Sequence, residues 1–183
     1  MPVFDYDPPE RFVAGAVGQP GSRAFFLQAR GGGRLTTVAL EKSQVAALAD
    51  RLDELLDEVL RRIGPQGHVP AMAPADLQDE APLDQPLIED FRVGTMTLGW
   101  DPETSLVVIE AKELIDDEDE IEGPEPAVLR VHISAKSARA FSKRALELVA
   151  AGRPACPLCG QPLEAEGHIC VRLNGYRAGR GGV

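Results

Sequence analysis

The sequence predicts an α+β fold of two βββα units, each an antiparallel meander followed by a helix, with a zinc knuckle at the C-terminal end. Two segments with helical periodicity, each preceded by three strand-like stretches, predict the units. The knuckle is predicted because all three cysteines lie near the end of the chain. We expect four parts: the first unit at 1–64, a linker or long loop at 65–90, the second unit at 91–152, and the knuckle with a basic tail at 153–183.

The first unit begins with three apolar stretches that are typical of strands. They cover residues 11–18, 23–30 and 34–41, and the last of them is rich in β-branched side chains. Turn residues separate them at 19–22 and at 31–33. This spacing predicts two consecutive hairpins.

A helix is predicted over residues 43–63. Ser43 is a candidate N-cap residue, because its hydroxyl can accept a hydrogen bond from the first turn. Gly64 and Pro65 end the helix. The apolar residues recur at intervals of three and four and form one stripe: Val45, Leu48, Leu52, Leu55, Leu56, Val59 and Ile63.

The segment 65–90 is rich in proline, alanine and acidic residues and has no periodicity, so we interpret it as a linker or a long surface loop. The second unit then repeats the order of the first. Strands are predicted at 91–98, 105–114 and 127–133, and a helix follows at 137–151.

Matching residues recur in the two units. Phe12 precedes Gly15 as Phe91 precedes Gly94, and a Lys-Ser pair stands ahead of both predicted helices. One interpretation is an internal duplication with a pseudo-twofold axis. The other is chance recurrence, since short strands and helices are common elements.

The spacing Cys156-x₂-Cys159-x₈-His168-x-Cys170 predicts a structural Zn²⁺ site. Zinc prefers thiolate and imidazole ligands in a tetrahedron, and cysteines separated by two residues can chelate from one turn. The His-x-Cys pair places both side chains on one face of an extended segment. Four protein ligands leave no open position, which favours a structural role over a catalytic one.

Two other interpretations of the cysteines are weaker. A redox Cys-x-x-Cys motif would open a helix after a strand and would not require His168 or Cys170. An iron site is compatible with three thiolates and one imidazole. The clustering of the thiols argues against a disulfide scaffold and for a reducing compartment.

The composition excludes several classes of function. A formal net charge of −10 disfavours a general nucleic-acid coat, although Arg172, Arg177 and Arg180 make the tail basic. No apolar run is long enough to span a membrane, and the first residues lack the pattern of a secretory signal, so we expect a cytoplasmic protein. Phosphate-binding and nucleophile-elbow motifs are absent from the sequence.

Outside the cysteine cluster, candidate catalytic residues are few. His132 lies between Val131 and Ile133 on a predicted strand, so its side chain points to the opposite face. A cleft that joined His132 to Glu110 or Glu113 would indicate an acid–base site. We therefore assign no catalytic residues.

The chain resembles a conserved family of high-GC Gram-positive bacteria that is catalogued as a domain of unknown function. The resemblance rests on Phe4-Asp5, Arg11-Phe12 and Ala14-Gly15 at the start, on Gln28-Ala-Arg30 and Leu40-Glu-Lys, and on the ending Cys156-Pro-x-Cys-Gly…Gly-His168-x-Cys170…Asn174-Gly-Tyr. It implies a cytoplasmic bacterial protein and supports the zinc ligands. It implies no activity.

Three functions remain as hypotheses. The first is a non-enzymatic adaptor that uses the knuckle, Asn174, Tyr176 and nearby arginines to bind another protein. The second is a nucleic-acid-binding protein that uses the knuckle and the arginine-rich tail. The third is an enzyme whose site is assembled from scattered residues. Each of these hypotheses is compatible with a homodimer.

Overall fold

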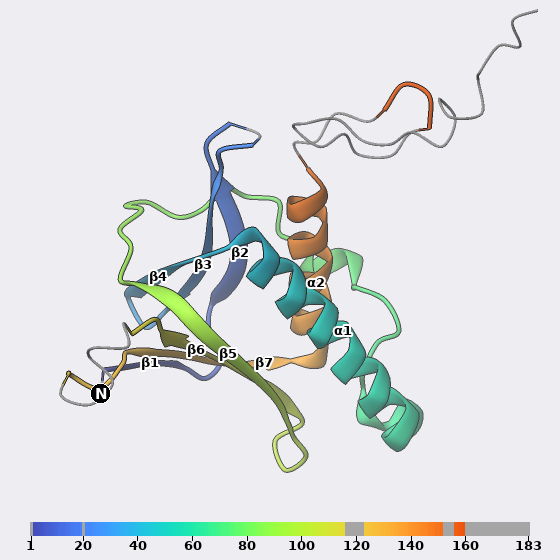
Figure 1. The fold of residues 1–183 in the computed structure, drawn as a ribbon. Helices are drawn as coiled ribbons and strands as arrows, with labels where there is room; N and C mark the ends of the chain where they lie inside the picture. Colours follow the sequence, from blue (N-terminus) through green and yellow to red (C-terminus); the bar gives the residue numbers. More distant parts are fainter. Residues whose placement is uncertain (1, 20, 116–122, 152–155, 160–183) are drawn as a thin grey trace, which may run out of the picture.

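The computed structural model describes every residue except 1, 20, 116–122, 152–155 and 160–183 (Figure 1). Its main elements are seven strands and two α-helices in an α+β arrangement. The strands are β1 (Val3–Tyr6), β2 (Arg11–Val17), β3 (Ala24–Gly31), β4 (Arg34–Leu40), β5 (Phe91–Asp101), β6 (Leu106–Glu113) and β7 (Val128–Ser134). The helices are α1 (Lys42–Ile63) and α2 (Ala135–Ala150), with short 3₁₀ turns η1 (Gly64–Gly67) and η2 (Ala75–Leu77).

All seven strands form one sheet in the order β1-β7-β6-β5-β4-β3-β2. Strands β2, β3 and β4 are an antiparallel meander, and so are β5, β6 and β7. The meanders meet through a parallel pair, in which Val38 of β4 lies beside Phe91 of β5. A second parallel pair joins β7 to β1, from Val3 beside Val128 to Tyr6 beside Val131. The sheet is therefore continuous through both predicted units.

The sheet must be strongly curled, because its two edge strands are consecutive in the chain. Only residues 7–10 separate β1 from β2. Five Cα–Cα steps reach at most about 19 Å, whereas seven flat strands would be about 29 Å wide. The Tyr6 hydroxyl is accordingly 2.7 Å from Oγ1 of Thr36, on β4. Curling therefore brings β1 close to β4 of the first meander.

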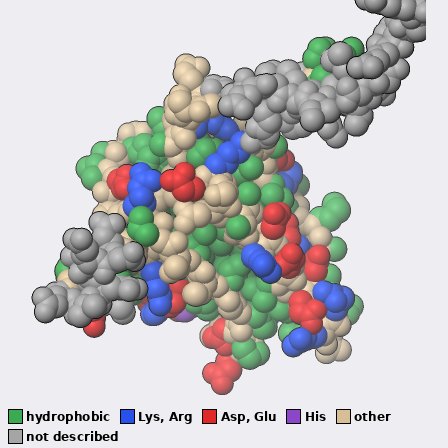
Figure 2. Space-filling view, viewed as in Figure 1, with side chains coloured by type: hydrophobic (Ala, Val, Ile, Leu, Met, Phe, Trp, Pro, Cys, Tyr) green, Lys and Arg blue, Asp and Glu red, His purple; other side chains and the backbone are tan. Residues whose placement is uncertain are grey.

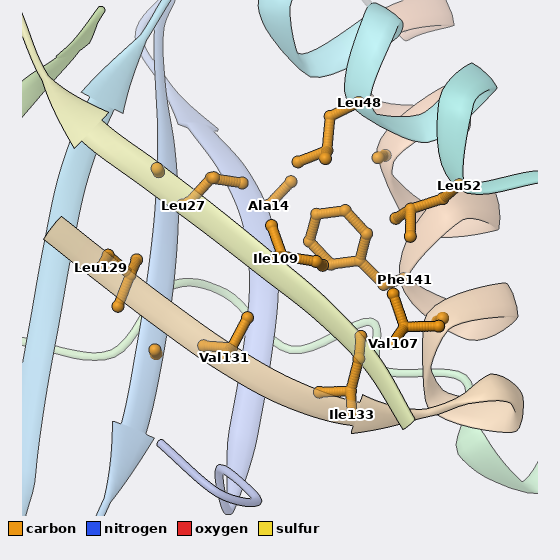
Figure 3. Close-up of a cluster of buried hydrophobic side chains, with 14 of the residues drawn as sticks. Ala14, Leu27, Leu48, Leu52, Val107, Ile109, Leu129, Val131, Ile133 and Phe141 are labelled. Carbon is orange, nitrogen blue, oxygen red and sulfur yellow. The ribbon is translucent and has the colours of Figure 1, made fainter. Parts of the chain in front are cut away.

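Both helices cover the inner face of the curled sheet and pack against each other (Figure 1). Strand residues alternate between the two faces, so every second side chain points toward the helices. Figure 3 shows this core: Phe141 of α2 lies among Ala14, Ile109 and Leu52, from β2, β6 and α1. Phe12 adds a stacked contact with Phe141, with 4.6 Å between the ring centroids.

The outer face of the first meander is covered by residues 78–90, which we call the strap. Leu83 of the strap is buried against Val13, Phe26 and Ala39, with Leu87 beside it. Gln28 fastens the strap by two hydrogen bonds to one residue: its Oε1 accepts from Asp84 N at 2.7 Å, and its Nε2 donates to Asp84 O at 3.0 Å. The first meander is thus packed on both faces.

Three details correct the expectations from sequence. The strand β1 was not predicted, and it raises the number of strands from six to seven. Ser43 is not the N-cap of α1; the cap is Glu41, whose N–H donates to Oε1 of Gln44 at 2.8 Å. The second helix begins at Ala135, two residues early, because the Ser134 hydroxyl caps it by accepting from Ser137 N. No helix in the described part of the chain is long and apolar enough to span a membrane.

Candidate functional site

The predicted metal centre lies beyond the end of α2, and half of it falls within the described residues. Cys156 is buried, with 5% of its surface exposed, and Cys159 is half-buried at the end of a short turn. His168 and Cys170 lie outside the described residues. Two thiols in one turn are the donor set that zinc prefers, so the described half fits the ion.

The described residues contain no group of three or more His, Cys, Asp or Glu side chains placed to hold a metal. That finding covers only two of the four predicted ligands, Cys156 and Cys159. The zinc site therefore stays a prediction from the spacing of the motif.

The end of α2 is fixed by an arginine from the first hairpin. Arg23 Nη2 donates to the carbonyl of Leu148 at 3.3 Å and to that of Ala151 at 2.5 Å. These carbonyls lie at the C-terminal end of the helix, where acceptors are left without an intrahelical partner and a cation is favourable. The Arg23 guanidinium also lies over the ring of Phe25. The contact ties the C-terminal end of α2 to the hairpin between β2 and β3.

Arg11 of β2 holds the strap through two carboxylates. Its Nε donates to Oδ2 of Asp79 at 2.7 Å and its Nη2 donates to Oδ1 at 3.0 Å, while Nη1 lies 3.1 Å from Oδ2 of Asp84. The hydrogen bonds from Arg11 are the main reason that the pKa of Asp79 lies below its ordinary value. Hydrogen bonding to Asp79 likewise raises the pKa of Arg11, against the opposing effect of burial. Both carboxylates therefore fasten the strap to β2.

Arg144 of α2 binds the same part of the strap from the helix side. It donates to carbonyl oxygens of three residues, Ala14, Asp79 and Ala81. Burial lowers its pKa, and the nearby Arg11 acts in the same direction, while Asp79 opposes both. A hollow of about 180 Å³ lies beside this network, lined by Arg11, Phe12, Phe141 and Arg144 among others. The guanidinium groups of Arg11 and Arg144 that line it are bound by the strap and, at Arg144 Nε, by the carbonyl of Ala14 in β2.

A second, partly buried network joins the two helices. Arg139 of α2, 6% exposed at its side chain, donates to Oδ1 of Asp53 at 2.7 Å and also to Asp57 and to the carbonyl of Pro70. Ser142 donates to the carbonyl of Ala49 at 3.0 Å and lies 2.8 Å from Oδ2 of Asp53. Sequence analysis missed the role of Arg139 and its two aspartates, because a charged residue in a helix is normally interpreted as solvent-exposed.

The structure does not bring the candidate acid–base residues together. His132 is on the outer face of β7 as predicted, and its Nε2 lies 3.5 Å from Oδ1 of Asp5. Glu110 accepts from Nε of Arg130 at 2.6 Å, and this bond is the main cause of its lowered pKa. Glu113 accepts from Ala127 N at 2.9 Å. We compared five hollows in the described part of the chain, and none is lined by these three residues.

The most apolar of those hollows is a groove of about 490 Å³ between α1 and β5. We call it the α1–β5 groove. One wall is formed by α1 and the other by Met96 and Leu98 of β5, and Leu55 is half-buried in the α1 wall. In Figure 2 apolar surface is visible between β5 and α1, and acidic and basic side chains gather over α1. The lining residues are Ala47, Leu48, Arg51, Glu54, Leu55, Glu58, Met96 and Leu98.

A comparison with family models matches residues 4–170 to a protein family of unknown function, DUF3090. The match covers the body and extends through the last predicted zinc ligand. The chain belongs to this family. Searches of curated proteins and of solved structures each gave no match. For this DUF3090 protein, function must therefore be argued from its own residues.

Proposed function

We propose that this protein is a zinc-binding interaction module, in which the βββα body is a scaffold and the C-terminal segment contacts a partner protein. The observation that carries the proposal is the Cys156-Pro-Leu-Cys159 turn: two metal-ligand residues lie close to the end of α2, and one of them is buried. Cys156, Cys159, His168 and Cys170 would complete a closed, structural Zn²⁺ site. When bound, the ion supplies folding free energy to a segment too small for its own core.

The body supports a scaffold role, because its charged side chains fasten segments to one another. Arg11 and Arg144 hold the strap, Arg139 holds α1 to α2, and Arg23 holds the end of α2. Groups with perturbed pKa values that meet in a cleft can mark an active site. Arg11, Asp79 and Arg144 do line the hollow of about 180 Å³, but both arginines bind Asp79 and so hold the strap. Here the lowered pKa values of Asp79 and Glu110 come from arginines that bind them structurally. The contact surface is therefore assigned to the C-terminal segment, with Asn174, Tyr176 and the adjacent arginines.

Affinity capture from a nuclease-treated lysate of the native host tests this function. The full chain is compared with the Cys156→Ser/Cys159→Ser variant and with Leu158→Ser, a control in the same turn whose side chain is exposed. We expect one protein at about equal molar amount with the wild type and the control, reduced at least about tenfold with the double variant. Equal capture by the double variant would contradict the proposal. Recovery of a nucleic acid when nuclease is omitted, with no protein partner, would favour the alternative of nucleic-acid binding.

We further infer that the two units arose by duplication and are related by a pseudo-twofold axis along the curled sheet. The support is topological: the last strand of each meander ends in a parallel pair, β4 with the first strand of the second meander, β5, and β7 with β1, the added strand that precedes the first meander. Each meander is followed by a helix on the inner face. An experimental structure in which residues 11–63 and 91–150 could not be superposed would contradict this inference.

A further inference from the structure

We propose that the α1–β5 groove is the interface of a symmetric homodimer, in which α1 of a second copy lies antiparallel in the groove. The groove has a volume of about 490 Å³ and a largely apolar lining. In its walls, Leu55 of α1 and Met96 and Leu98 of β5 are only half-buried. This inference goes beyond the proposed function and does not depend on the metal.

The groove has the shape that a helix requires. Its α1 wall is a single stripe, because the residues that form it recur at intervals of three and four. They are Ala47, Leu48, Arg51, Glu54, Leu55 and Glu58. The β5 wall is open because α1 leaves Met96 and Leu98 partly uncovered. A twofold axis beside Leu55 would seat each α1 between β5 and α1 of the partner. Leu55 of each copy would then cover Met96 and Leu98 of the other.

The charges of the stripe identify the occupant as a second copy. Along the stripe, Arg51 is basic, Glu54 and Glu58 are acidic, and Arg61 and Arg62 are basic. In an antiparallel pair centred between residues 54 and 55, Arg51 faces Glu58 of the other copy, and the twofold axis forms this pair twice. A C₂ interface must be self-complementary in this way. Arg51 and Glu58 are thus complementary to the reversed copy of the stripe.

The ion pairs that these side chains form within one chain do not prevent them from pairing with a second copy. Arg51 pairs with Glu54 at 3.1 Å, and Glu58 pairs with Arg61 at 2.8 Å and with Arg62 at 2.5 Å. Apart from Glu58, which is 39% exposed, each of these side chains is at least 66% exposed. Exposed pairs within a helix contribute little, so the side chains can turn to a partner at small cost.

Sedimentation equilibrium of the full chain tests the dimer. We expect twice the 19.6 kDa of one chain at micromolar concentration. Arg51→Glu should raise the dimer dissociation constant at least about tenfold, because it faces Glu58 of the other copy. Glu58→Arg should do the same, and the double variant should return to within about threefold of the wild type, because the pair is restored with reversed sign.

Two further variants keep the test decisive. Reversing Lys143 and Glu147, an exposed pair on α2 that lies outside the groove, should leave the mass unchanged. Leu55→Glu should give a monomer with an unaltered circular dichroism spectrum. A wild type that stays monomeric at 100 times the concentration used, or a dimer that neither Arg51→Glu nor Leu55→Glu weakens, would overturn the proposal. Failure of the double variant to restore the dimer would overturn the antiparallel register.

Discussion

Leu83 of the strap packs directly onto the backbone of Gly15 in β2. A Cβ atom at Gly15 would lie 2.5 Å from both Cγ and Cδ2 of Leu83, closer than real Cβ contacts allow. The absence of a side chain at position 15 therefore lets the strap lie against the sheet. It also explains why a glycine stands within a buried strand, where it would otherwise weaken the strand.

Gly15→Ala is expected to lower the free energy of unfolding by about 1–3 kcal/mol, because the added methyl group displaces Leu83. Urea denaturation of the full chain measures the change. In the Gly15→Ala/Leu83→Ala variant the clash is absent, so the double variant should be more stable than the sum of the single effects predicts. The control is Gly99→Ala in β5, where an added Cβ would meet no atom within 4 Å. Additive effects of the two substitutions would show that the contact is not the cause.

Arg139→Met is expected to cost about 3 kcal/mol of stability, because it leaves the carbonyl of Pro70 and the carboxylate of Asp53 without their donor. The cost should stay below that of a fully buried pair, since Asp53 and Asp57 are partly exposed. Lys143→Met on the same helix is the matched control, because its ion pair with Glu147 is exposed. Equal melting temperatures of the two variants would contradict a structural role for Arg139.

The pKa of Asp79 is lowered in the folded protein, so this group binds fewer protons folded than unfolded just below its ordinary pKa. Its contribution to stability is present above about pH 4 and is lost as the pH falls through the lower folded value. Asp79→Asn should therefore reduce stability at pH 7 and flatten the decline of stability as the pH falls below about 4. Denaturation at several pH values measures both effects. The control is Asp76→Asn, on the surface of η2; a slope altered equally in both variants would contradict the assignment to Asp79.

The elements with a strong local pattern were predicted from sequence. The stripe of α1 from Val45 to Val59 and the two meanders appear at nearly the predicted bounds, because alternation and helical periodicity are local properties. Ile63, at the end of the stripe, is instead 44% exposed. The predicted position of His132 on the face opposite Val131 and Ile133 was also confirmed, since both of those residues are buried and His132 is not.

The features that were missed depend on contacts between residues distant in sequence. The four residues of β1 are too few to show a pattern, and their partner in the sheet is β7, more than a hundred residues away. The strap has no periodicity, and its bonds join Asp79 to Arg11 and Asp84 to Gln28 across 68 and 56 positions. Gly15 was noted as matching Gly94, but its role required knowing that Leu83 lies above it. The zinc ligands remain a prediction from spacing, since His168 and Cys170 lie outside the described residues.

The most direct test of the account is the zinc content of the purified full chain, measured by inductively coupled plasma mass spectrometry. We predict one zinc ion per chain for the wild type and for Leu158→Ser, and loss of the ion in Cys156→Ser, Cys159→Ser, His168→Ala and Cys170→Ser, because each removes one of four ligands. A wild type that binds no zinc when purified with zinc present would contradict the account. So would full zinc occupancy in the Cys156→Ser variant.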